Sequence, residues 1–410
     1  MTTSLNLDEY RHLVMKWALF LFFALYISTI VSAQTASVFL DLPDTLSLEH
    51  NRVFSFKVDK YWESRMEEIS GQKLEISIDE IAYNGVEVKA KSVKTRGQTT
   101  LYFKRKSYSI SLKKPIQLGE YEVKKLALNN LAMDKNYFRN RLSFLLMEKI
   151  GIFPLQNYYS ELRINNNTAG IYLAIQKPED YVRSKESNLL VRRDYEERFI
   201  IEDSHGKDTK DQIKRLRDIR KLTKRYEGQQ LYDSLNAVVH MDHYFQWLAF
   251  NYLVKNGDYT DELFFYLTPD ENRFDIIPWD YDDIFMRQPH ESFEQRNRVL
   301  DHRLLFSGEE YLDIVIDSDN YLYHEFLLNF QRVLEILNPE TIKDIFEKVY
   351  RELFPYYSDQ EIIAQSEYDQ YGLTDLRTLI EDLQYQFQFL LFQRQSVEAI
   401  IKSEMTRLSE

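Results

Sequence analysis

The stretch IIPWDYDDIFM, residues 276–286, places three aspartates between apolar residues that otherwise have the pattern of a buried strand. An ionised carboxylate buried without a partner is costly, so Asp280, Asp282 and Asp283 must face solvent, meet basic side chains or hold a cation. A solvated turn is the simplest interpretation of an isolated acidic cluster. The neighbouring sequence decides whether a cation site is the better one.

The order of the surrounding elements brings further carboxylates to this stretch. The pattern predicts a helix that stops at Gly257, with Asp258 directly after it, and then a hairpin of LFFYL and RFDIIPW around the turn PDEN. A hairpin brings its two ends together, so we expect Asp258 and Asp280 to lie close in space. The same cleft would contain the neighbouring carboxylates Asp261, Glu262 and Asp282.

The rest of the chain divides into a strand-rich first half and a helix-rich second half. From Lys73, apolar and polar residues alternate as in half-buried strands, and NYFRNRLSFLLMEKIG adds an amphipathic helix. From Met241 onward the periodicity is mainly helical. We predict an α+β fold with residues 1–33 as a signal peptide, 34–72 as an N-terminal extension, 73–235 as a sheet-rich N-lobe and 236–410 as a helical C-lobe.

A strongly basic segment precedes the second half of the chain. Residues 207–225 contain nine basic residues. Apolar residues three apart predict one exposed amphipathic helix over this segment, with a docking surface for an acidic partner as the alternative. The apolar residues are Ile213, Leu216, Ile219 and Leu222.

The N-terminus predicts export from the cytoplasm. The apolar run of residues 17–31 follows basic residues and leads to Val31-Ser32-Ala33, which is typical of a secretory signal cleaved after about Ala33; an uncleaved membrane anchor is the alternative. The chain has no cysteine, which excludes disulfides and thiolate chemistry and suits a bacterial protein. We expect a secreted, periplasmic or cell-envelope protein without a stable membrane span after signal removal.

The net charge bears on the kind of partner. Acidic residues exceed basic ones, 65 against 52, giving a net charge of −13. This balance disfavours a general role in coating nucleic acid.

Six motifs in order, TRGQTT, KRKSYSISL, DKNYFRNRLSFLLMEKIG, NNTAGIYL, NGDYTDELFFYL and IIPWDYDDIF, resemble the CotH spore-coat kinase family. The similarity runs from about Lys73 to the C-terminal helices. It implies an atypical protein-kinase-like bilobal fold that binds ATP with Mg²⁺ or Mn²⁺ and phosphorylates protein serine or threonine. A Ca²⁺ site that only stabilises the fold is an alternative use of the acidic cluster.

The resemblance also implies roles for individual residues. Arg96 and Lys106 would contact phosphate, Asp258 would be the catalytic aspartate and Asp280 would bind the metal ion. Strand parity independently places Lys106 on the same face as Tyr108, which is expected to be covered.

Three positions depart from the family pattern. Gln176, which would lie at the nucleotide, stands where the family usually has Glu; Leu263 stands where it often has Asn, and Met286 where the motif commonly ends in Gly. Glu262 or Asp261 could replace the metal ligand lost with that Asn. For Asp282 and Asp283, a solvated or structural ion-pair role stays as open as metal binding. These departures leave two functions open: an active secreted kinase, and a pseudokinase that binds a surface partner.

Overall fold

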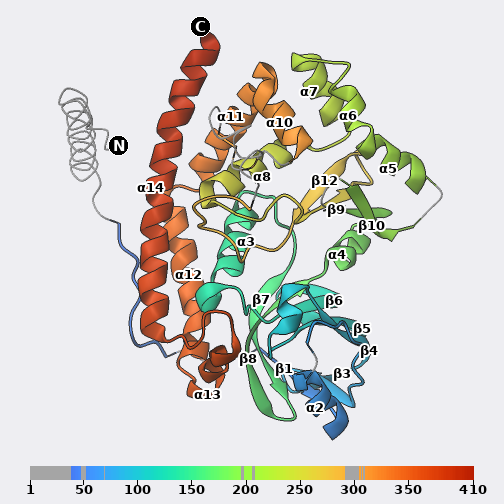
Figure 1. Cartoon of the computed structure of the whole chain (residues 1–410), viewed down its shortest axis with the longest axis vertical. Coiled ribbons are helices and arrows are strands. Elements are labelled where there is room, and N and C mark those ends of the chain that lie inside the picture. The colour runs from blue at the N-terminus through green and yellow to red at the C-terminus, as the bar shows by residue number, and fades with distance from the viewer. Residues whose placement is uncertain are drawn as a thin grey trace, which may run out of the picture. The chain divides into compact units, whose positions relative to one another are not determined.

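The computed structural model describes residues 38–47, 52–68, 70–194, 198–205, 208–290, 304–305, 307 and 310–410. The predicted signal peptide lies outside these residues. Residues 41–410 belong to one unit, which contains all the elements discussed below (Figure 1). Within the described ranges, no helix combines the length and apolar character needed to cross a membrane.

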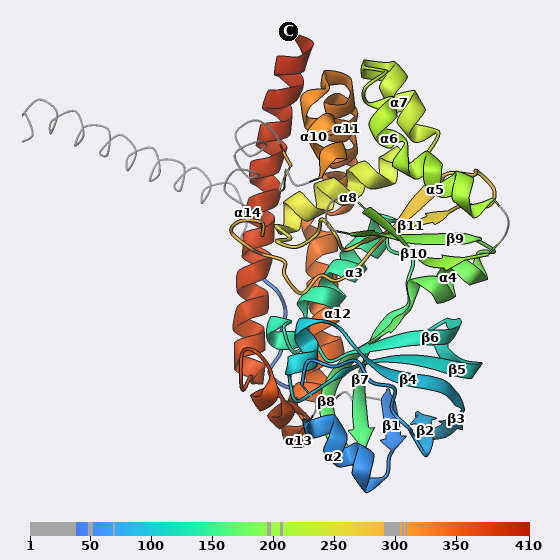
Figure 2. The same ribbon diagram turned by 45° about the vertical axis from the view of Figure 1, so that its right-hand side comes forward.

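One large sheet is built from the first half of the chain, in the strand order β3-β2-β1-β7-β8-β6-β5-β4 (Figure 2). Neighbouring strands are antiparallel except β1 and β7, which run parallel. The strands are β1 Val53–Lys57, β2 Glu80–Tyr83, β3 Val86–Val88, β4 Ala90–Arg96, β5 Ser107–Leu118, β6 Tyr121–Asn129, β7 Asn157–Ile164 and β8 Asn167–Gln176.

The alternation of apolar residues explains where the core of this sheet lies. Tyr108, Ile110 and Leu112 of β5 are all at most 2% exposed and share one cluster with residues of β1, β6 and helix α2 (Lys60–Glu68). The register of β5 against β6 shifts between Ser111 and Ile116, because the intervening Pro115 has no N–H to donate. The core side of the sheet therefore matches the face predicted from strand parity.

Residues 74–79 do not form the predicted regular strand. Ile76 N donates to Val93 O of β4, whereas Asp79 N donates to Lys57 O of β1. The segment passes from β4 to β1 within a few residues, so it does not form a continuous series of hydrogen bonds with either strand. The strand β2 starts only at Glu80.

A second sheet has four antiparallel strands in the order β10-β9-β11-β12. Its strands are β9 Leu189–Asp194, β10 Arg198–Ser204, β11 Leu263–Leu267 and β12 Phe274–Pro278. The pairing of β9 with β11 crosses residue 235, the predicted lobe boundary. The hairpin β11–β12 matches the hairpin predicted from LFFYL and RFDIIPW.

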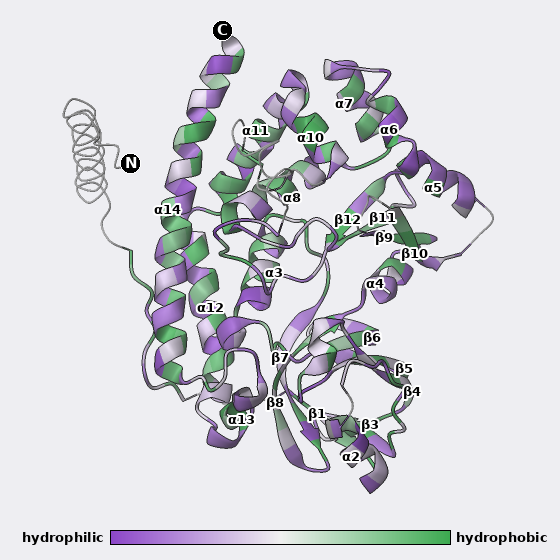
Figure 3. Ribbon diagram, viewed as in Figure 1, coloured by the Kyte–Doolittle hydropathy of each residue, from purple (hydrophilic) through white to green (hydrophobic). Residues whose placement is uncertain are grey.

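The helical elements lie mainly in the second half of the chain. Helix α8 has 14 residues, ten of them buried, which fixes the position of its C-terminal end. Polar and apolar residues are interspersed along α12 and α14, as in helices with one covered face (Figure 3). The helices are α3 Arg139–Lys149, α4 Pro178–Ser184, α5 Thr209–Arg217, α6 Ile219–Leu222, α7 Gly228–Asn236, α8 Met241–Val254, α10 Tyr311–Ser318, α11 Asn320–Ile336, α12 Pro339–Tyr357, α13 Gln360–Ala364 and α14 Leu376–Ser409. Short 3₁₀ turns are η1 Thr99–Tyr102, η2 Lys135–Tyr137 and η4 Gln365–Tyr368.

The basic segment is two helices instead of the predicted one. The first, α5, ends at Arg217, and α6 begins at Ile219, with Asp218 acting as the C-cap of one and the N-cap of the other. Asp218 has low helix propensity, and its side chain pairs with Lys221 at 2.7 Å, which favours this break. With sheets and helices in these proportions, the predicted α+β class is confirmed.

Candidate active site

The loop after α8 carries the predicted catalytic aspartate. Lys255 adopts a left-handed conformation with φ 52°, which ends the helix. Asn256 is 1% exposed; its Nδ2 donates to Asn251 Oδ1 at 3.1 Å, and its Oδ1 accepts the backbone N–H of Asp258 at 3.2 Å. A buried side-chain amide thus holds the loop that presents Asp258.

The β11–β12 hairpin closes the site from the other side. Leu263 pairs with Pro278, and just beyond this pair Trp279 N donates to Glu262 O at 2.9 Å. Asp280 follows with φ 47°, a left-handed conformation that few non-glycine residues adopt. The two ends of the hairpin therefore meet, as the sequence predicted.

The segment after Asp280 packs directly on the loop after α8. Gly257 N donates to Asp283 O at 2.9 Å, Met286 N donates to Lys255 O at 3.0 Å, and His290 N donates to Gly257 O at 2.8 Å. A Cβ atom at Gly257 would lie only 2.7 Å from Asp283 Oδ2. The absence of a side chain at Gly257 is what permits this close approach.

These two segments concentrate negative charge. We call the group of six carboxylates the acidic cluster: Asp258, Asp261, Glu262, Asp280, Asp282 and Asp283. Burial first and then the charge of Asp261 raise the pKa of Asp258 to about 6; His290 lowers it, and Asp283 and Asp280 raise it by smaller amounts. Burial first, and Asp280 next, raise the pKa of Glu262 and of Asp282 well above the usual range. The cluster is therefore crowded enough for its members to destabilise one another's ionised forms.

Two arginines offset part of this charge. Arg192 Nη2 donates to Glu262 Oε1 at 3.1 Å. Arg96 lies at the end of β4, with its guanidinium 5.3 Å from the centre of the Trp279 ring, and Nη1 donates to Asn129 Oδ1 at 2.5 Å. Burial raises the pKa of Asp280, whereas the charges of Arg96 and Arg192 lower it. Arg96 thus lies at the acidic cluster, whereas its predicted contact with phosphate stays a prediction.

Two buried oxygens of the cluster lack partners. Asp261 Oδ1 and Glu262 Oε2 have no hydrogen bond within the described residues. In the same residues, no three His, Asp or Glu side chains form a preorganised metal site. Mg²⁺ is usually held by one or two carboxylates together with waters and substrate phosphates, whereas Ca²⁺ takes six to eight oxygens. The donor set fits a nucleotide-bound Mg²⁺ or Mn²⁺ better than a closed Ca²⁺ site.

Lys106 is placed apart from the acidic cluster. Its Nζ donates to the carbonyls of Leu101 at 2.8 Å and Phe103 at 2.5 Å, and burial alone lowers its pKa. It lines a cavity of about 150 Å³ together with Tyr108. Strand parity predicted this covered face, but the acidic cluster lies elsewhere.

Gln176 has a local structural contact instead of a contact with the cluster. Its Nε2 donates to Asp180 Oδ2 at 3.2 Å, at the start of α4. The neighbouring Glu179 is among the carboxylates whose charge acts on Arg96. The carboxylate in this part of the site is therefore Glu179, three residues after Gln176, the position where the family usually has Glu.

Sequence reasoning missed Arg192 and Asp134. Asp134 is 2% exposed, accepts the backbone N–H groups of Arg139 and Asn140 at 2.9 Å each, and acts electrostatically on Asp282. Burial raises its pKa to about 7, against the lowering effect of these hydrogen bonds. The available signal for Arg192 was two adjacent arginines in the apolar strand LLVRRD, one of which must point to each face.

One curated protein is similar to this chain over much of its length. Inner spore coat protein H of Bacillus subtilis (strain 168) is 23% identical over 276 residues, which cover 63% of this chain and 72% of that protein.

Two solved structures show weaker similarity. The proinflammatory kinase CtkA of Helicobacter pylori has 10% identity and a TM-score of 0.31, over 68% of this chain and 94% of that one. The HipA, HipB and operator DNA complex of Shewanella oneidensis MR-1 has 13% identity and a TM-score of 0.30, over 85% of this chain and 76% of that one.

The family model described as CotH kinase protein matches residues 93–384, which is more than half of the 410 residues. This match includes Arg96, the loop after α8 and the whole acidic cluster. It confirms the predicted family and, with the α+β architecture, the kinase-like fold class. The chain belongs to the CotH kinase protein family.

Proposed function

We propose that this chain is a protein kinase that acts outside the cytoplasm, transferring the γ-phosphate of ATP to a serine or threonine hydroxyl with Mg²⁺ or Mn²⁺. The observation that carries the proposal is the acidic cluster, with two buried carboxylate oxygens that lack partners in the described residues. Such oxygens are costly unless a cation joins them.

Each part of the site has a role in this proposal. Asp258, with a pKa of about 6, is ionised at neutral pH and basic enough to orient and deprotonate a substrate hydroxyl. Asp280, Glu262 and Asp282 would hold the cation, which supplies charge neutralisation on the phosphates. Arg96 would add a fixed positive charge beside them. Phosphoryl transfer depends mostly on such positioning and charge compensation.

The cellular location is also part of the proposal. The N-terminal sequence predicts a secretory signal, and a relative carries the name inner spore coat protein H. An envelope or coat location would require the enzyme to use ATP available outside the cytoplasm.

Transfer of label from γ-labelled ATP tests this function. We expect the full-length chain to label itself or a general acceptor such as casein with Mg²⁺ or Mn²⁺, and Asp280→Ala to lose on the order of 10²–10³-fold in rate. Asp270→Ala, an exposed aspartate in the turn of the same hairpin, is the matched control. Absence of transfer with either cation contradicts the proposal.

A second function, a catalytically inactive binding module, is favoured by one observation. Lys106 is occupied by the carbonyls of Leu101 and Phe103 instead of facing the acidic cluster. In that case Asp258→Asn would leave partner capture unchanged, and neither ATP nor cation would raise the melting temperature. A rise with Ca²⁺ alone, without an effect of ATP, would indicate the structural Ca²⁺ site.

A further inference from the structure

A cavity of about 590 Å³ lies between the four-stranded sheet and helices α5, α6 and α10, and no residue of the acidic cluster lines it. We call it the arginine pocket. Helices α5 and α6 lie beside the β9–β10 end of the sheet (Figure 2), and Arg217 Nη2 donates to Phe199 O at 3.5 Å. Its cations and main apolar lining are Arg193, Arg217, Arg220, Ile200, Leu216 and Phe265.

The innermost cation of this pocket is incompletely satisfied. Arg193 is 3% exposed; its Nη1 donates to Tyr244 Oη at 2.8 Å, and Nε donates to Thr260 O at 2.5 Å and lies 3.7 Å from a Glu310 carboxylate oxygen. Its Nη2 is buried without a hydrogen-bond partner among the described residues. A buried guanidinium N–H without an acceptor costs free energy that an incoming carboxylate could recover.

The rim of the pocket is positively charged. Residues 209–225 contain eight basic and two acidic residues, in a chain with a net charge of −13. Arg217 and Arg220 are exposed and also line the pocket. Charge of this sign attracts acidic partners and repels basic ones.

The wall of the pocket is apolar. Ile200 on β10 is 46% exposed, whereas Leu216 and Phe265 are 1% and 3% exposed. The cavity volume lies within the range of about 300–1,000 Å³ that is typical of ligand pockets. Two carboxylates of the chain, Asp194 and Glu310, also line the pocket, and Glu310 faces Arg193, so the excess of positive charge comes from Arg217 and Arg220 at the rim. An apolar wall beside these rim cations fits a large apolar side chain flanked by carboxylates.

We propose that the arginine pocket docks an acidic segment of a partner protein, which places an apolar side chain against Ile200, Leu216 and Phe265 and carboxylates at the arginines. The proposal does not depend on kinase activity. It does connect the two sites, since adjacent residues of β9 bind one loop: Arg192 binds Glu262, and Arg193 binds the carbonyl of Thr260. The pocket and the acidic cluster therefore meet opposite faces of β9, with Arg193 lining the pocket and Arg192 bound to the cluster.

Fluorescence anisotropy with a defined probe tests this proposal. The probe is a fluorescein-labelled pentapeptide with phenylalanine flanked by two glutamates on each side, titrated with the full-length chain at about 0.1 M salt, where surface charges are screened beyond about 10 Å. Two comparison peptides replace the phenylalanine by alanine or all four glutamates by lysine. We expect binding of the probe and at least about tenfold weaker binding of both comparison peptides.

Two matched pairs of variants locate the binding. Ile200→Asp and Arg217→Glu alter the pocket, and we expect each to weaken binding by about tenfold. Ile201→Asp changes a neighbour that is 48% exposed and does not line the pocket, and Lys214→Glu changes another exposed cation of α5. These two controls should change binding by less than about twofold.

The outcomes separate the proposal from its alternatives. Equal effects within each pair would show a general charge attraction and overturn the pocket assignment. Absence of probe binding, equal binding of the lysine peptide, or displacement of the probe by single-stranded DNA or by anionic phospholipid vesicles at equal charge would also overturn it. Since binding is measured without ATP, an inactive kinase site would leave the result unaffected.

Discussion

Buried charges are paired within the chain in one region of this molecule, whereas carboxylates outnumber their counter-charges in another. Near the large sheet, Arg105 forms an ion pair with Asp369, their side chains being 3% and 4% exposed, and Arg141 is bound by both oxygens of Glu352 at 2.8 Å. In the acidic cluster, six carboxylates face mainly two arginines and His290, which pairs with Asp283 at 2.9 Å, so negative charge is in excess.

The two regions differ in what their buried charges do for stability. Where each buried charge has a partner within the chain, the pair holds elements together: Arg105 also donates to the carbonyls of Ala169 and Ile171. Where negative charge is in excess, the ionised carboxylates oppose folding. We therefore expect mutations in the two regions to change stability in opposite directions.

The largest effect is expected from breaking a matched pair. Arg105→Met should lower the free energy of unfolding by about 3–5 kcal/mol, because Asp369 would remain buried without its counter-charge. Urea denaturation measures the change. Arg377→Met is the control: its partner Glu381 and Arg377 itself are 62% and 85% exposed, so we expect less than about 0.5 kcal/mol. Equal effects of the two variants would contradict a stabilising role for the buried pair.

The opposite sign is expected in the acidic cluster. Glu262→Gln should keep the hydrogen bond with Arg192 while removing a charge whose ionisation is disfavoured by burial and by Asp280. The protein without added cation should gain about 1 kcal/mol of stability. It should also lose most of the rise in melting temperature that millimolar Mg²⁺ with ATP produces.

A control on the surface sharpens this second prediction. Glu271→Gln removes an exposed carboxylate that pairs with Arg273, and it should leave the response to Mg²⁺ and ATP unchanged. If Glu262→Gln destabilised the protein without cation, positive charges of the chain itself, such as Arg192, would already compensate the charge of Glu262.

The sequence predicted the half of the site that depends on local order. The helix stop before Asp258 and the hairpin before Asp280 are adjacent in the chain, so hairpin geometry alone brought the two aspartates together. The counter-charges could not be found in this way. Arg192 reaches Glu262 only because β9 pairs with β11, two strands about 70 residues apart.

Lys106 illustrates a second limit of sequence reasoning. Alternation correctly predicted that Lys106, just before β5, is covered on the same side as Tyr108, since both are buried and line one cavity. Which face of a sheet borders the site depends on which elements cover it, and these are distant in sequence. Here that face is shared with β1, β6 and α2, and the lysine binds the carbonyls at the end of the η1 turn.

A smaller effect concerns the pH dependence of activity. Because burial and neighbouring carboxylates raise the pKa of Asp258 to about 6, its proton is retained below that pH. The rate should fall about tenfold for each pH unit below 6 and level off above about 7. Initial rates at saturating ATP check this. A pH-independent rate between about 5 and 8 would exclude Asp258 as the base.

Stability should follow the opposite trend for this residue. A raised folded-state pKa means that the contribution of Asp258 is fully present below its unfolded pKa, about 3.8, and is lost as the pH rises through about 6. Asp258→Asn should therefore be more stable than the natural chain at pH 7 and similar to it at pH 4.

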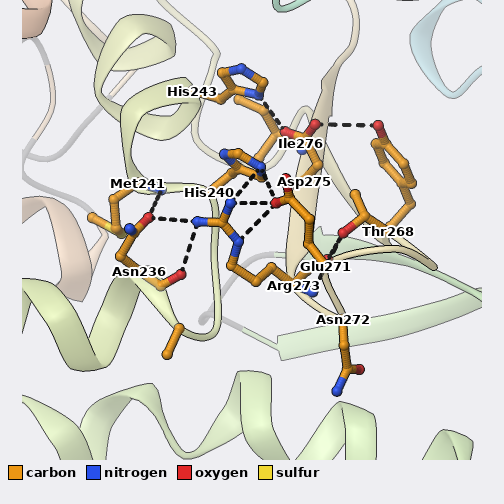
Figure 4. A network of polar contacts seen from close by, with 12 residues as sticks. Asn236, His240, Met241, His243, Thr268, Glu271, Asn272, Arg273, Asp275 and Ile276 are labelled. Carbon is orange, nitrogen blue, oxygen red and sulfur yellow. Dashed lines mark hydrogen bonds and ion pairs between the residues drawn. The ribbon is translucent and has the colours of Figure 1, made fainter.

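The smallest effect is expected where a buried carboxylate is matched by a titratable cation. His243 Nδ1 lies 2.8 Å from Asp275 Oδ1, beside a network that joins His240, Glu271 and Arg273 (Figure 4). The hydrogen bond with Asp275 raises the pKa of His243, against the effect of burial, and His243 helps to lower the pKa of Asp275 against burial.

The sign of the resulting pH dependence distinguishes this pair from the acidic cluster. Stability from His243 is fully present below its unfolded pKa of about 6.5 and is lost as the pH rises through the higher folded value; stability from Asp275 is lost at acidic pH. His243→Gln should thus cost about 0.5 kcal/mol at pH 6 and almost nothing at pH 9, measured by urea denaturation. Activity should not change, because this network contains no residue of the acidic cluster. A loss that is equal at both pH values would mean that packing of the imidazole ring, and not its charge, stabilises the contact, leaving Asp275 closer to the unmatched carboxylates than to the matched pairs.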